Sequence, residues 1–295
     1  MSMSRDRRRC LAALGLLPAL GAATPAAGPA SLIRHSLVQL PQDAPNYELA
    51  VLTLLLERTR ASHGPYRLAF APPMSQSRAL LQLAGGELDV ATSITTAQHE
   101  ARALAVRVCL YRGLIGIRLP IALARRRAEL ERVASLGEAR RLRLAQVESW
   151  PDTQILKANG WPVQGITRRD SFPELLTRER IDLFALGAIE VYPLVDALPA
   201  LAVLGGWLIA YVAPSYFFVS PRRPELAERL RRGWDLALAD GSFAALFEQW
   251  LGPQLQRAAL PERRWLTLRN PGLPTDTPLQ DERLWHPLVS ARLRA

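Results

Sequence analysis

The side chains best suited to hold a small polar molecule gather between Thr92 and Arg102. Thr92, Ser93 and Thr95 carry hydroxyls that donate and accept hydrogen bonds, and Arg102 follows the acidic Glu100. A guanidinium can bind a carboxylate through two parallel hydrogen bonds, a geometry that a lysine ammonium cannot reproduce. Residues of these types can together bind an anionic group. Two plainer interpretations stay open, because threonine is also a common β-former and an arginine on a short helix is often only a surface residue.

Three residues in the middle of the chain extend the candidate site. Ser149 and Trp150 precede Pro151, a residue type that favours the first turn of a helix, and the free N–H groups of such a turn can hold an anion or a polar group. Trp150 can instead pack against the joint between two lobes. Glu190 can hold a cation, or it can be an exposed carboxylate at a helix start.

The sequence offers little for catalysis. It contains no G-x-S-x-G, H-E-x-x-H, P-loop or G-x-G-x-x-G motif, and its four histidines lie far apart without a recognisable partner spacing. His99, close to Glu100 and Arg102, is the histidine that could serve as an acid or base. Once the N-terminal segment is removed, Cys109 stands alone and is expected to be a buried thiol. We therefore predict no catalytic residue, no metal site and no cofactor.

The elements that position these residues alternate between strand and helix patterns. Hydroxyl residues begin and a glycine pair ends a predicted helix over residues 75–86, and the β-branched run 88–95 predicts a strand. Strands are also expected over 31–40, 66–70, 106–111 and 114–119, with a helix from Asn46 to about Thr59. The same alternation restarts after Pro120. This order is typical of an α/β fold whose ligands bind at the open ends of the strands.

An ordered set of residues resembles the bacterial periplasmic solute-binding proteins of the amino-acid type. The pattern consists of Arg78, Leu81, Gly86, Asp89, Thr95, Thr96, Arg102 and Tyr111. The resemblance covers most of residues 31–255. It implies a type II periplasmic-binding-protein-like α/β fold, with two lobes around central sheets joined by two crossing strands and a ligand closed in the cleft. It also implies that Arg102 is the carboxylate-binding arginine, with Arg78 and Arg118 as the next candidates.

The resemblance and the restarting pattern together give a domain organisation. We expect a signal peptide over 1–27, one lobe over 31–117 plus 212–255, a second lobe over 118–211, and an extended C-terminal arm over 256–295. The run from Trp150 to Gly160 and the tail motif from Asn270 to Leu279, with Trp285 nearby, are similar to a Gram-negative subgroup of the same family. Amino-acid binders of the family place an aspartate after the last strand of the second lobe. Here Glu190 is the nearest acid, which weakens the case for an amino-acid ligand.

Composition and the front end favour export over nucleic-acid binding. The net charge is +10, but the arginines are scattered, Lys157 is the only lysine, and the aromatic content of 7% is thin for base stacking. Residues 5–9 form a cationic segment before an apolar one that ends in small residues, as in a secretory signal. The arginines fit a twin-arginine signal and an ordinary one equally well.

These observations lead to one functional prediction. We expect an exported, periplasmic, monomeric binding protein that captures a small anionic or zwitterionic molecule by lobe closure and does no chemistry on it. An ABC permease or a sensor kinase is the expected protein partner. A small-molecule enzyme of dehydratase type on the same scaffold is the alternative.

Overall fold

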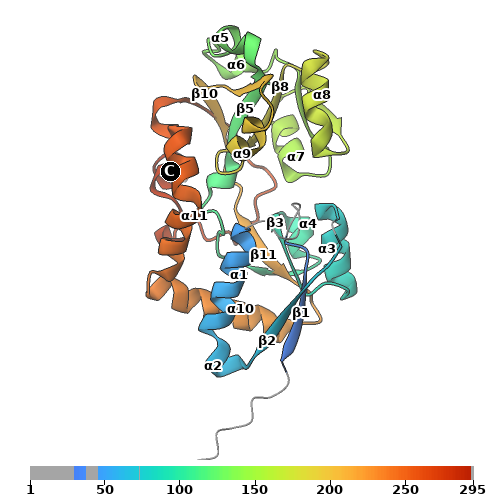
Figure 1. Ribbon diagram of the computed structural model, residues 1–295, viewed down its shortest axis with the longest axis vertical. Helices are drawn as coiled ribbons and strands as arrows, with labels where there is room; N and C mark the ends of the chain where they lie inside the picture. The colour runs from blue at the N-terminus through green and yellow to red at the C-terminus, as the bar shows by residue number, and fades with distance from the viewer. Residues whose placement is uncertain (1–29, 38–45, 73, 294–295) are drawn as a thin grey trace, which may run out of the picture.

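The structure is a computed structural model that describes residues 30–37, 46–72 and 74–293. It contains a five-stranded sheet and a seven-stranded sheet, each packed with helices, and the two bodies lie one above the other in Figure 1. We call the body with the five-stranded sheet the first lobe and the other the second lobe. The predicted signal peptide lies outside the described residues.

The first lobe has the strand order β2-β1-β3-β11-β4, in which β1, β2 and β3 are parallel and β11 runs antiparallel to its neighbours. Its elements are β1 (Ser31–His35), α1 (Tyr47–Arg58), α2 (Arg60–His63), β2 (Tyr66–Phe70), α3 (Gln76–Gly85), β3 (Val90–Ile94), α4 (Ala97–Glu100), β4 (Leu104–Val106), β11 (Ser215–Val219) and α10 (Pro224–Ala239). Asn46 and Ser75 cap α1 and α3 as predicted, each accepting a hydrogen bond from a backbone N–H in the first turn.

The second lobe has the strand order β12-β10-β5-β8-β6-β7, with β9 paired to β5. Its elements are β5 (Ile117–Leu123), α5 (Arg127–Leu130), α6 (Leu136–Ala139), β6 (Leu144–Val147), α7 (Pro151–Ala158), β7 (Val163–Ile166), α8 (Phe172–Thr177), β8 (Leu183–Gly187), α9 (Val191–Asp196), β9 (Leu201–Val203), β10 (Trp207–Ala210) and β12 (Arg264–Thr267), with short 3-10 turns η1 (Leu114–Gly116), η2 (Ala124–Arg126) and η3 (Arg169–Ser171). Helix α7 begins at Pro151 and is followed by its C-cap Asn159 and by Gly160 at φ 75°, as the sequence predicts.

Two differences from the sequence expectations concern the joint and the tail. Residues 107–111 are not a strand as predicted, because the pairing of β11 on this side ends at Val106 and the chain then turns towards β5. The predicted strand over 114–119 begins only at Ile117, since residues 114–116 form η1. The tail, expected to be an extended arm, contributes β12, which pairs with β10 in parallel. It follows α11 (Ser242–Ala258) and η4 (Leu260–Glu262), and it ends in η5 (Glu282–Leu284) and α12 (Pro287–Leu293).

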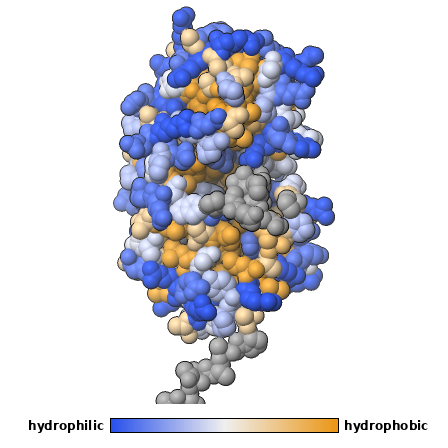
Figure 2. Space-filling model, viewed as in Figure 1, coloured by the Kyte–Doolittle hydropathy of each residue, from blue (hydrophilic) through white to orange (hydrophobic). Residues whose placement is uncertain are grey.

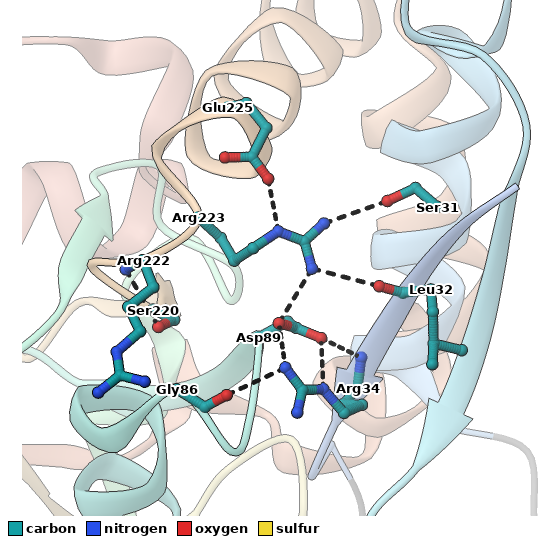
Figure 3. Close-up of polar contacts among 9 residues, drawn as sticks. All are labelled: Ser31, Leu32, Arg34, Gly86, Asp89, Ser220, Arg222, Arg223 and Glu225. Carbon is teal, nitrogen blue, oxygen red and sulfur yellow. Dashed lines mark hydrogen bonds and ion pairs between the residues drawn. The ribbon is translucent and has the colours of Figure 1, made fainter. Parts of the chain in front are cut away.

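A buried carboxylate ties the discontinuous parts of the first lobe together (Figure 3). Asp89, 1% exposed, accepts hydrogen bonds from the backbone and guanidinium of Arg34 on β1, at 2.7 to 3.0 Å. Arg223, which follows β11, lies 3.0 Å from Oδ1 of Asp89, the oxygen that also accepts from Nη2 of Arg34. Arg223 also donates to the carbonyl of Leu32 and the hydroxyl of Ser31. The returning chain is thereby fixed to the first strand.

The surface carries both hydrophobic and hydrophilic areas. On the face shown in Figure 2, hydrophobic residues gather in separate areas of the upper and lower bodies, with hydrophilic residues around them. Among the residues that the structure describes, no helix is both long and apolar enough to cross a membrane. Cys109 is buried as predicted, and burial raises the pKa of its thiol to about 11.

Candidate functional site

A cavity of about 330 Å³ lies between the two lobes, near the segments that join them. The first lobe contributes the start of α1, part of α3 and the end of β3. The second lobe contributes the start of β5, the first turn of α7, η3 and the residues after β8. The lining combines carboxylates and guanidiniums with the rings of Tyr47, Tyr111 and Trp150. Such a cavity suits a molecule of amino-acid size that carries charge.

Arg118 is the charged centre of the second-lobe wall, and it is 3% exposed. Its guanidinium is paired with Asp152, donates to the hydroxyl of Tyr211 at 3.1 Å, and lies 3.3 Å from Glu190. Tyr211 in turn donates to Asp152. Burial alone would lower the pKa of Arg118, but the charge of Asp152, with Tyr211 and Glu190, outweighs burial and raises it. Arg118 is therefore a fixed cation whose charge Asp152 already balances.

Glu48 is the carboxylate of the first-lobe wall. One oxygen accepts a hydrogen bond from the hydroxyl of Tyr111 at 2.7 Å, and the other accepts one from the hydroxyl of Thr92 at 2.8 Å. Burial raises the pKa of Glu48, the two hydrogen bonds lower it in part, and the charge of Glu190 raises it again. Each oxygen keeps a second lone pair, so Glu48 can still accept a hydrogen bond from a bound molecule.

Glu190 and Arg169 supply one further charge of each sign. Glu190 precedes α9, and one of its oxygens accepts a hydrogen bond from the backbone N–H of Gly187 at 3.0 Å while its side chain stays 39% exposed. Arg169, in η3, lines the same cavity, and its guanidinium has no hydrogen-bond or ion-pair partner among the described residues. The cavity therefore offers groups for a cation and for an anion.

Four of the sequence-predicted site residues line this cavity. They are Thr92, Ser93, Trp150 and Glu190. The hydroxyl of Ser93 donates to the carbonyl of Ile94 at 2.9 Å, and Thr92 acts through its bond to Glu48. Trp150 lies at the second-lobe edge of the cavity and also lines a separate groove beside α4. Strand β3 and the first turn of α7 thus meet across the cleft.

The other predicted residues lie elsewhere. Thr95 is buried and donates to Glu100 at 2.7 Å. Ser149 lines the groove that α4, the start of α7 and residues 270–272 form beside the cavity. Arg102 is exposed just after α4 and belongs to the lining of neither space. Its role as a carboxylate clamp stays a prediction.

Sequence reasoning did not single out Glu48, Asp152 or Arg169 as site residues. Glu48 sits two residues after the cap of α1, so its sequence signal is that of a helix-start acid. Asp152 looks equally like an acid that complements the start of α7. Arg169 is one of many scattered arginines. Only the meeting of the lobes distinguishes these residues from surface charges.

The described part of the chain contains no group of three or more His, Cys, Asp or Glu residues that could hold a metal ion. His99 lines the groove and not the cavity. Its Nδ1 lies 2.9 Å from the carbonyl oxygen of Ile94 and 3.2 Å from the hydroxyl of Ser93. Burial lowers the pKa of His99, and the charge of Arg102 adds to that effect.

No protein-family model matches this sequence, and no curated protein resembles it at the sequence level. Solved structures do resemble it in fold. An arginine-specific periplasmic binding protein from Salmonella typhimurium matches with a TM-score of 0.59 at 12% identity, over 75% of this chain and 100% of the other. A periplasmic His/Glu/Gln/Arg/opine family-binding protein from Silicibacter pomeroyi, in complex with lysine, matches with a TM-score of 0.58 at 11% identity, over 75% and 97%.

A probable amino-acid ABC transporter extracellular-binding protein from Bacillus subtilis gives a TM-score of 0.56 at 15% identity, over 76% of this chain and 100% of the other. At these identities the likeness concerns the fold. It confirms the predicted fold class, because this chain shares the α/β fold of these periplasmic and extracellular binding proteins.

Proposed function

We propose that this protein is an exported solute-binding protein that holds a small zwitterionic molecule in the cavity between its lobes, for uptake by an ABC permease or for sensing. The fold supports the binding role, because the structural neighbours are named as periplasmic or extracellular binding proteins. The location and size of the cavity support a small-molecule ligand. The charges of its lining support the choice of a zwitterion.

The charges that line the cavity favour a zwitterionic ligand. Arg118 and Asp152 neutralise each other inside the wall. The other charged groups that line the cavity are the carboxylates of Glu48 and Glu190, which are negative, and the guanidinium of Arg169, which is positive. A purely anionic molecule would meet two carboxylates, and a purely cationic one would leave Arg169 without a counter-charge. A molecule with an ammonium and a carboxylate satisfies both.

The anionic group is assigned to Arg169, which lines the cavity, in preference to Arg102, which does not. Arg118 is a weaker candidate because Asp152, Tyr211 and Glu190 already occupy its guanidinium. The cationic group is assigned to Glu190, with Glu48 opposite it. The rings of Tyr47 and Trp150 supply apolar surface for the rest of the molecule.

A thermal-shift experiment with matched compounds tests this proposal. The set pairs each α-amino acid with the amine and the carboxylic acid of the same carbon skeleton. A zwitterion at a hundred times its dissociation constant should add about 2.7 kcal/mol of stability, whereas the matching amine and acid should add little. Stabilisation by acids alone, or by no compound in the set, would refute the assignment. NMR of the incubated ligand separates binding from the enzymatic alternative, since a binding protein leaves the compound unchanged.

A further inference from the structure

The chain beyond α10 does not stay on one lobe. Helix α11 begins against the first lobe, where the rings of Phe243 and Trp234 lie 4.6 Å apart and those of Phe247 and Tyr47 lie 6.4 Å apart. Its last turn contacts the second lobe, where Arg257 forms a bidentate ion pair with Asp196 of α9, with both hydrogen bonds at 2.6 Å. The helix runs alongside both bodies in Figure 1.

The residues after α11 are anchored in the second lobe. Arg263 is buried and donates to the carbonyls of Ala258 and Leu204 and to the hydroxyl of Tyr192. Strand β12 then pairs with β10 over its whole length, from Arg264 beside Trp207 onward. This attachment combines sheet hydrogen bonds with a buried guanidinium.

The segment that follows β12 returns to the first lobe across the joint. Asn159, at the end of α7, donates to the carbonyl of Arg269 and accepts from its N–H. Asn270 donates to the carbonyl of Val212, which lies in the chain segment between β10 and β11. These contacts hold the returning segment on the second lobe and directly on the joint.

The same segment then docks on the first lobe. Asp276 lies 3.4 Å from the guanidinium of Arg107. The carbonyl of Trp285 accepts from the guanidinium of Arg112, and the N–H of His286 donates to the backbone carbonyl of Arg112 at 2.8 Å. Trp285 packs so closely on Gly113 that a Cβ there would come within 2.7 Å of the indole. This docking combines an exposed ion pair with hydrogen bonds to main-chain carbonyls and a close contact of the indole.

We propose that residues 259–293 form an interlobe brace that fixes the angle between the lobes and so presents the cavity as a preformed site. A two-lobed protein joined only by two crossing segments can open and close about them. Among the described residues of this chain the lobes are also linked by α11 and by the returning segment, each contacting both bodies. A hinge with these extra links has little freedom to swing.

The proline-rich run from Asn270 to Leu279 stiffens the brace. Pro271, Pro274 and Pro278 restrict the backbone of the returning segment. Thr277 within it is buried, and its hydroxyl donates to the carbonyl of Pro274. A stiff segment transmits force between its two anchor points, whereas a flexible one would only tether them. The N-P-x-L-P-x-x-T-P-L run is thus the rigid part of the brace.

Distance measurement between the lobes tests the brace and needs no ligand. Spin labels are placed at Leu81→Cys on α3 and Arg178→Cys after α8, both exposed, in a chain with Cys10→Ser. Cys109 is buried and will resist labelling. Double electron–electron resonance should give one narrow distance distribution for the otherwise unaltered chain.

A flexible Gly-Ser insert of about 12 residues between Gly272 and Leu273 gives the segment roughly 20 Å of slack. It should broaden the distribution and add longer distances. The same insert at the exposed Pro199, within the second lobe, is the matched control and should leave the distribution narrow. A second variant, Asn159→Ala with Asn270→Ala, should broaden it without any insertion, and circular dichroism checks that each variant is folded.

A broad distribution in the unaltered chain would overturn the brace. So would an unchanged distribution in both the Gly272 insertion and the asparagine variant, or equal broadening by the two insertions.

Discussion

Replacing Asp89 by alanine should strongly destabilise the first lobe. The change removes a carboxylate that is 1% exposed and leaves the guanidiniums of Arg34 and Arg223 without their shared partner (Figure 3). Removing one partner of a buried ion pair typically costs about 3–5 kcal/mol. Arg34 and Arg223 are 43% and 23% exposed and regain some hydration, so we expect the lower end, about 3 kcal/mol. At about 2.1 cal/mol/K of unfolding entropy per residue, that corresponds to a fall in Tm of roughly 5 °C.

Thermal unfolding followed by circular dichroism at pH 7 measures this effect. The matched control is Asp170→Ala, because Asp170 also pairs with an arginine, Arg168, but both side chains are exposed. The control should leave Tm unchanged within error. Equal values of Tm for the Asp89 and Asp170 variants would refute the claim that the buried network holds the first lobe together.

The pH dependence of the Asp89 effect has a definite sign. Burial opposes ionisation of Asp89, but the hydrogen bonds from Arg34 and the charge of Arg223 outweigh it and lower the pKa. A carboxyl with a lowered folded-state pKa contributes stability that is fully present above its unfolded pKa of about 3.9 and is lost as the pH falls through the folded value. The Tm difference between wild type and Asp89→Asn should therefore be constant from pH 8 to about pH 5 and shrink below about pH 4.

Three further predictions concern the cavity and the thiol. Glu48→Gln should raise Tm at pH 7, because a carboxyl whose pKa is raised by burial costs stability above its unfolded pKa. This gain in Tm should vanish in acid, where the carboxyl of the wild type is also neutral. The same variant should bind an amino-acid ligand on the order of tenfold more weakly in calorimetry. Arg169→Ala should lose the ligand while Arg102→Ala keeps near wild-type affinity, and the reverse order would return the clamp to Arg102. Cys109 should react with a thiol reagent only after unfolding, because burial raises its pKa to about 11, and rapid labelling of the native protein would contradict its placement.

The sequence predicted much of the architecture because local signals and packing agree there. Asn46 and Ser75 begin helices where their side chains can accept from free N–H groups, and the Asn159-Gly160 pair ends α7 where left-handed geometry is needed. The expectation of a strand over 106–111 is wrong because alternation in sequence cannot tell a sheet partner from a turn, and β11 ends its pairing at Val106.

The site was harder to predict because it depends on which surfaces face each other. Thr92 and Trp150 come from opposite lobes, and both line the cavity between them. Glu48 and Asp152 have the sequence signature of helix-start acids, and only the cavity gives them a second role. Strand β12 was missed for a similar reason, since its partner β10 lies more than fifty residues earlier.

Calorimetric titration tests most directly the claim that a zwitterion binds in the cavity between the lobes. The strongest zwitterionic ligand from the thermal-shift set is titrated into wild type, Glu190→Gln, Arg169→Gln and the exposed control Glu174→Gln. We predict that the two cavity variants bind far more weakly, by a loss on the order of 2–5 kcal/mol for a charge pair enclosed between the lobes, and that Glu174→Gln binds as wild type does. Equal affinity in all four proteins would contradict it, because the ligand would then bind outside the cavity between the lobes.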